Sequence, residues 1–100
     1  GDWLLVRPDG VGELDVRGTI EMQDGALIYV TYSGYVTDVF ALLPRWQQGE
    51  EIPRDAYSFV TTPRFETSAA SYEWLQRAVT VGIGTLIGGG VSYEIFVVRA

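Results

Sequence analysis

The sequence predicts an all-β fold, an antiparallel β-barrel of about six to seven strands with one short helix, in a single domain over residues 1–100. Two observations favour it: strand-like alternation and β-branched runs extend through most of the chain, and turn-forming Gly, Pro and Asp recur at short intervals. With 47% apolar and 20% charged residues, the chain can bury a core and is not disordered. Closure into a barrel would remove exposed sheet edges.

The first part of the chain predicts three strands. A short apolar strand at Trp3–Arg7 ends in the turn Pro8–Gly10. Val11–Met22 alternates between apolar and polar residues, which places the two kinds on opposite faces of a strand. Asp24-Gly25 then predicts a hairpin, because both residue types tolerate positive φ. We expect Ala26–Tyr35 to pair antiparallel with the preceding strand.

The stretch Val36–Asp55 has a less regular pattern. Val39–Leu43 fits either a helical turn or a short strand before Pro44. The apolar residues of Leu42–Trp46, with Ile52, are interpreted as a plug for one barrel end, and an exposed patch for a partner is the alternative.

The last part of the chain predicts three more strands and one helical segment. Ala56–Thr67 is a long strand in which Pro63 must lie at an edge or bulge, because proline cannot donate to a ladder. Ser68–Gln76 is typical of one or two helical turns. The final two strands are predicted at Ala78–Ile87 and Val91–Val98, and Gly88–Gly90 connects them.

Glycines within the predicted strands, at 18, 82 and 84, suit positions where a barrel strand bends. The glycine-rich segment Gly82–Gly90 does not have the spacing of a dinucleotide fingerprint, and a strand follows it where that fingerprint needs a helix. We therefore interpret it as a bend and a tight turn.

Missing residue types exclude several chemistries. The sequence has no His, Cys or Lys, so it offers no Ser-His-Asp or Cys-His pair, no tetrahedral zinc site and no Schiff-base lysine. Carboxylates are not clustered as a hard cation requires, so we expect no metal and no cofactor. A net charge of −6 with scattered arginines predicts no binding to nucleic acid or to anionic membrane surfaces. The first residues lack signal-peptide features, which favours a cytoplasmic location.

Two charged pairs are the first candidate site. Asp15 with Arg17, and Arg64 with Glu66, are spaced so that each pair shares one sheet face. Inside a barrel lumen, Asp15 or Glu66 would be a candidate catalytic base, and Arg17 and Arg64 would bind an anionic group of the ligand. The alternative interpretations are solvent-facing ion pairs, or internal pairs that fix strand register.

Aromatic residues are the second candidate site. An aromatic side chain offers a flat apolar face, and tyrosine adds one hydroxyl, which suits a flat, partly polar ligand. In strands, such residues also serve as ordinary core or cross-strand packing. The candidate ligand-binding aromatics are Tyr29, Tyr57, Phe59, Trp74 and Tyr93.

Several blocks of the sequence resemble the small-barrel family catalogued as domain of unknown function 3237, or uncharacterised protein family 0311. The blocks are Asp2-Trp3, Arg7–Gly10, Asp15–Arg17, Asp24–Val30, Thr62–Thr67, Tyr72–Leu75 and Gly90–Tyr93. The resemblance implies an antiparallel barrel with a central pocket, often oligomeric, and little about chemistry. The resemblance also implies further strands before the Asp2-Trp3 block, and those strands are missing from this sequence. At the position of Gln76 the family commonly has an Asn. The open edge would then be covered by another subunit, by exchanged strands or by a reorganised closure, so we expect a homo-oligomer.

Three functions are compatible with the sequence. The first, which we favour, is a β-barrel that binds a small apolar or aromatic metabolite. The second is a cofactor-independent isomerase, cyclase or lyase, in which a carboxylate is the base and Arg17, Arg64 or Tyr93 stabilises an oxyanion. The third is a structural oligomer subunit with a filled barrel. The sequence does not decide whether the protein is an enzyme. A cavity with only hydroxyls and aromatics would favour the binding protein, and a buried carboxylate in it would favour the enzyme.

Overall fold

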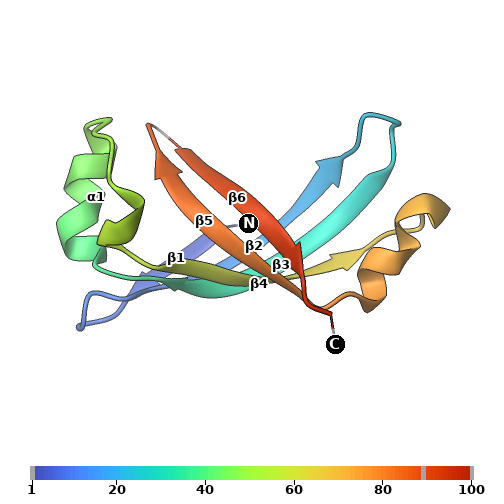
Figure 1. The fold of residues 1–100 in the computed structure, drawn as a ribbon, viewed down its shortest axis with the longest axis horizontal. Helices are drawn as coiled ribbons and strands as arrows, with labels where there is room; N and C mark the ends of the chain where they lie inside the picture. The colour runs from blue at the N-terminus through green and yellow to red at the C-terminus, as the bar shows by residue number, and fades with distance from the viewer. Residues whose placement is uncertain (1, 89, 100) are drawn as a thin grey trace.

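The computed structural model describes residues 2–88 and 90–99 and consists of one curled antiparallel sheet (Figure 1). Its six strands follow the order β1-β2-β3-β4-β5-β6, so each strand pairs with its neighbours in sequence. The strands are β1 Asp2–Val6, β2 Gly12–Glu21, β3 Leu27–Val36, β4 Phe59–Glu66, β5 Thr80–Ile87 and β6 Gly90–Val97. The helical elements are α1 Val39–Gln47 and the 3₁₀ segments η1 Arg54–Ala56 and η2 Ala70–Arg77.

This architecture confirms the all-β antiparallel prediction, with one short α-helix in the described part of the chain. The sheet is not closed, however. Within residues 2–88 and 90–99, β1 and β6 each pair on one side only and not with each other. A closed barrel needs that last ladder, because closure is what removes sheet edges. The molecule is therefore a barrel-like half-shell.

The hairpin between β2 and β3 forms where Asp24-Gly25 predicts it. Gly25 has φ 87°, a conformation that glycine adopts without steric cost. The Asp24 carboxylate accepts a hydrogen bond from the Ala26 backbone N–H at 3.1 Å, which closes the turn locally. The register that follows pairs Glu21 with Leu27 and continues for the full length of both strands. This turn fixes which residues of β2 and β3 share a face.

The concave face of the sheet is the apolar one. Tyr32 on β3 and Tyr93 on β6 touch although two strands separate them in the sheet, so the sheet curls towards the face that carries both. The register adds Leu14, Val16 and Phe59 to that face. Its most buried cluster is formed by Val36, Val39 and Phe59.

The segment after β3 is helical and covers one end of the concave face. Val39–Gln47 forms α1, so the helical alternative was correct, and the helix continues past Pro44. Val39 and Leu42 are buried, and Ile52, which follows the helix, is also buried. Figure 1 shows α1 at one end of the curled sheet and η2 at the other. The position of α1 fits the interpretation of this segment as a plug.

Pro63 lies in β4, which has β3 on one side and β5 on the other, so this strand is not at the sheet edge. Pro63 pairs with Tyr32 of β3, but the ladder between β4 and β5 covers only Val60 and Thr61. Proline is therefore placed just beyond the point where β4 stops pairing with β5, so its missing N–H costs nothing on that side.

Gly82 and Gly84 lie where the strand packs closely against other groups. A Cβ at Gly82 would lie 2.4 Å from the Thr61 hydroxyl, whereas one at Gly18 would meet nothing within 4 Å. Gly82 therefore has a steric reason to be glycine, and Gly18 has none in this structure. Part of the predicted Gly88–Gly90 turn, residue 89, lies outside the described residues.

Candidate functional site

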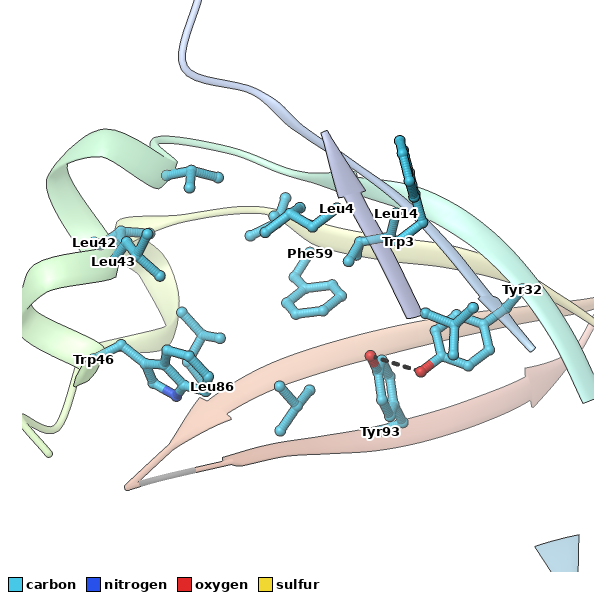
Figure 2. Close-up of a pocket in the computed structure, with 14 residues that line it drawn as sticks. Trp3, Leu4, Leu14, Tyr32, Leu42, Leu43, Trp46, Phe59, Leu86 and Tyr93 are labelled. Carbon is cyan, nitrogen blue, oxygen red and sulfur yellow. Dashed lines mark hydrogen bonds between the residues drawn. The ribbon is translucent and has the colours of Figure 1, made fainter. Parts of the chain in front are cut away.

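The concave face holds a hollow of about 280 Å³ between the sheet and α1 (Figure 2). Every strand of the sheet and α1 contribute to its lining, and all of the lining residues have apolar or aromatic side chains. They are Trp3, Leu4, Leu14, Val16, Tyr32, Val36, Val39, Leu42, Leu43, Trp46, Phe59, Leu86, Val91 and Tyr93. Among the described residues, no charged side chain lines this pocket, so it favours a neutral occupant.

The floor of the pocket is the Phe59 ring, which lies against β5. A Cβ on Gly84 would approach this ring to 2.6 Å, so only glycine leaves room for Phe59 in this position. The ring meets Tyr93 edge-to-face, with centroids 5.6 Å apart and an interplanar angle of 90°. Edge-to-face contacts of this kind fix the orientation of both rings.

Two tyrosines form one side wall. Tyr32 and Tyr93 have ring centroids 5.3 Å apart, and the Tyr32 hydroxyl donates a hydrogen bond to the Tyr93 oxygen at 3.2 Å (Figure 2). These are the only side-chain hydroxyls in the described lining of the pocket. Each hydroxyl has one donor and two acceptor positions, so the pair can hydrogen-bond a polar group of a ligand.

Trp46 on α1 forms the opposite wall. Its indole Nε1–H donates to the carbonyl oxygens of Ile87, at 2.9 Å, and Gly90, at 3.0 Å. These bonds tie α1 to the ends of β5 and β6. Because the indole has a single donor, which these two carbonyls share, the ring offers only its apolar surface to the pocket.

Comparisons with known proteins give the family. The model of the protein family of unknown function DUF3237 matches residues 1–98. The chain belongs to this family. A relative in uncharacterised protein family 0311 from Clostridium acetobutylicum is 38% identical over 80 residues, 80% of this chain and 51% of the relative. One from Rhodopseudomonas palustris is 35% identical over 81 residues and 53% of its own length.

Solved structures of similar proteins share the fold of this chain. A conserved protein of unknown function from Rhodopseudomonas palustris superposes with a TM-score of 0.87 at 31% identity, over 98% of this chain and 66% of that one. A protein from Acinetobacter baumannii described as β-barrel-like gives 0.77 at 35% identity, over 98% of this chain and 62% of that one. The chain thus spans about half the length of these curated relatives, and 62% and 66% of these two solved chains.

Two of the aromatic residues predicted from the sequence lie in the pocket of this DUF3237 chain. They are Phe59 and Tyr93. Tyr57 packs against the buried cluster, and its hydroxyl accepts a hydrogen bond from the Leu86 backbone N–H at 2.7 Å, so it supports the pocket from outside. Tyr29 lies on the convex face opposite Glu66. Trp74 belongs to η2 and is 49% exposed, outside the described lining of the pocket.

The predicted charged residues do not line the pocket. Asp15, Arg17, Arg64 and Glu66 are all exposed. The register places Arg17 and Arg64 on either side of Thr31, on the convex face of three adjacent strands. Each pair shares a face, as its spacing predicts, but that face is the outer one. In β2, strand alternation forces this arrangement, because Leu14 and Val16, which alternate with Asp15 and Arg17, face the pocket.

Sequence reasoning missed Tyr32, Trp46, Leu14 and Val16 as lining residues. The alternation of β2 did place Leu14 and Val16 together on one face, but it does not say which face becomes concave. Tyr32 reaches the pocket through the curl of the sheet, for which the sequence carries no local signal. Trp46 belongs to the segment interpreted as a plug, and the position of α1 makes it a wall of the pocket.

Other ionisable groups with displaced pKa values lie away from the pocket. Desolvation by burial, together with a hydrogen bond to the Asp24 carboxylate at 3.2 Å, raises the pKa of Tyr72 above its ordinary value. This contact holds η2 against the β2–β3 hairpin. Within residues 2–88 and 90–99, no group of three or more potential ligands could hold a metal ion, and no helix is long and apolar enough to span a membrane.

Proposed function

We propose that this protein binds a small, neutral, apolar or aromatic molecule in the concave pocket. The observation that carries the proposal is the lining: apolar and aromatic side chains surround about 280 Å³, with the Tyr32 and Tyr93 hydroxyls at one side. A dry cavity of about 150 Å³ lined by Leu, Ile and Phe is large enough for benzene. The pocket is therefore large enough for a bicyclic aromatic compound.

The chemistry of the lining supports binding more than acid–base catalysis. An isomerase or lyase of the expected kind needs a carboxylate at the reacting atoms. No carboxylate is found among the lining side chains that the structure describes, and Asp15 and Glu66 lie on the convex face. The tyrosine pair would position one carbonyl or hydroxyl group of the ligand, and the remaining contacts would be apolar burial.

Calorimetric titration with 2-naphthol tests the proposal. This probe has two fused rings and one hydroxyl, and we expect a Kd on the order of 0.1 mM from typical binding energies per atom. Val16→Lys should abolish binding, because a charge would be buried without a partner. Tyr93→Phe should weaken it by about tenfold through loss of the hydroxyl, in a chain whose rings still pack.

Arg64→Ala is the matched control. If the concave pocket is the site, this convex-face variant binds 2-naphthol as the unaltered chain does. Binding that is lost in Arg64→Ala but kept in Val16→Lys and Tyr93→Phe would overturn the proposal and move the site to the convex face. Native mass spectrometry of freshly purified protein would also show any retained small molecule.

A further inference from the structure

A second hollow lies on the same concave face, on the other side of the tyrosine pair. Its volume is about 150 Å³, and its lining also lacks charged side chains among the described residues. Ile20, Val30, Phe65 and Ile95 supply most of the wall, together with Thr61 and Pro63. The Thr61 hydroxyl is directed to the Gly82 carbonyl oxygen at 3.4 Å, so this second compartment is nearly as apolar as the first.

Tyr32 and Tyr93 are the two residues that line both compartments. They come from β3 and β6 and meet over the concave face through their hydroxyls, 3.2 Å apart. They therefore form a partition between the two compartments on the concave face. The hydrogen bond between Tyr32 and Tyr93 joins two neutral hydroxyls, and the net contribution of such a bond is about 1 kcal/mol. A ligand that offers its own hydrogen-bonding group can replace it at little cost.

Size indicates how the two compartments are used. Ligand sites in proteins usually have volumes of about 300–1,000 Å³. The larger compartment, at about 280 Å³, falls just short of that range, whereas the two compartments together lie inside it. One molecule that fills both compartments would bury more apolar surface than any that fills one.

We infer that the ligand is elongated, with an apolar or aromatic arm in each compartment and a central carbonyl or hydroxyl group that binds Tyr32 and Tyr93. This inference rests on the proposed function and specifies its ligand class. The central group accepts a hydrogen bond from a tyrosine hydroxyl in place of the Tyr32–Tyr93 bond. The two arms lie on opposite sides of the partition.

Comparison of benzophenone with acetophenone tests whether the ligand has two arms or one. Both have a carbonyl group, but benzophenone has a phenyl ring on each side of it and acetophenone has only one. We expect benzophenone to bind at least about tenfold more tightly, because burial of a second ring contributes more than a factor of ten. Diphenylmethane, which has both rings and no carbonyl, should bind about three- to tenfold more weakly than benzophenone. That difference should disappear in Tyr32→Phe/Tyr93→Phe.

Three tryptophan substitutions locate the arms. Ile20 lines only the second compartment and is half-exposed, so Ile20→Trp fills that compartment without burying a new group in the core. It should reduce benzophenone affinity to that of acetophenone and leave acetophenone unchanged. Val91→Trp, in the first compartment, should weaken both ligands. Val60→Trp, on the convex face, is the matched control and should change neither.

Photolabelling gives an independent readout. Irradiated benzophenone attaches to nearby C–H bonds, and peptide mapping should find labels in β2 or β6 residues of both compartments. Equal binding of benzophenone and acetophenone, or no effect of Ile20→Trp, would overturn the two-compartment inference and leave the proposed function standing. If neither ketone binds and 2-naphthol does not bind either, the proposed function itself is wrong.

Discussion

The Tyr32 hydroxyl donates a hydrogen bond to the Tyr93 hydroxyl, 3.2 Å away, although the two residues are 61 positions apart in sequence. This contact requires a strongly curled sheet, because β4 and β5 lie between the strands that carry the two residues. It also places two hydroxyl groups between the two compartments of the concave face.

Tyr32→Phe should lower the free energy of unfolding by about 0.5–1.5 kcal/mol, the usual net value of a neutral hydrogen bond. Urea denaturation measures the loss. Because Tyr93→Phe removes the same bond, the double variant should cost less than the sum of the two single variants. Tyr35→Phe, whose hydroxyl lies on the exposed convex face, is the control and should be close to neutral. Strict additivity would show that the hydroxyls do not interact.

Gly84→Ala should destabilise the fold by about 1–3 kcal/mol, as overpacking of a filled core does. The added Cβ would lie 2.6 Å from the Phe59 ring, and Phe59 is buried and cannot move aside freely. Gly18→Ala is the matched control within a strand, because its Cβ would meet nothing within 4 Å. Alanine there should be neutral or stabilising. Thermal unfolding of both variants checks the contrast, and equal losses would contradict the packing argument.

Trp46→Phe should loosen α1 and lower stability by about 1–3 kcal/mol, because the carbonyls of Ile87 and Gly90 lose a shared donor. Amide hydrogen exchange is the direct measurement: the Leu42 amide of α1 and the Gln48 amide just after it should exchange faster, while strand amides of β2 and β3 should not. Trp74→Phe, in the exposed η2 segment, should leave exchange in α1 unchanged. Unaltered exchange in Trp46→Phe would show that other contacts hold the helix.

Asp9 should make stability depend on pH at the acidic end. A hydrogen bond from the Arg7 guanidinium, followed by one from the Val11 backbone N–H, holds the pKa of the Asp9 carboxyl below its ordinary value of 3.8. A lowered pKa in the folded state means that this contribution is fully present above the ordinary pKa and is lost as pH falls through the folded one. Urea unfolding from pH 5 downwards should show a smaller acid-induced loss for Asp9→Asn. The effect should shrink in high salt, since the pair is exposed. Identical pH profiles would contradict it.

The outer edge of β6 allows a test of the expected homo-oligomer. β6 is unpaired on its outer side in the described chain, and Ile95, Phe96, Val97 and Val98 are all exposed, a pattern that invites pairing with another strand. We predict that the 100-residue chain self-associates as its concentration rises, measured by sedimentation velocity. Phe96→Lys should shift it towards monomer, and Val60→Lys, away from the edge, should not. A monomer at every concentration would contradict the prediction.

Much of the fold follows from local sequence, as the predicted hairpin and strands show. The Asp24-Gly25 hairpin, the alternation of Val11–Met22 and the order of six strands depend on φ preference and a two-residue period, which neighbouring residues alone express. Phe59 and Tyr93 were predicted as binding residues and do line the pocket. Their contribution to ligand binding stays a prediction.

Local sequence is enough to predict which side chains share a strand face: Leu14 with Val16, and Asp15 with Arg17. Which of those faces curls inward depends on contacts between distant strands, such as Phe59 over Gly84 and Tyr32 against Tyr93. A two-residue period is symmetric between the faces of a flat sheet. The curl of this sheet breaks that symmetry. It places Leu14 and Val16 on the concave face and the charged Asp15 and Arg17 on the convex face.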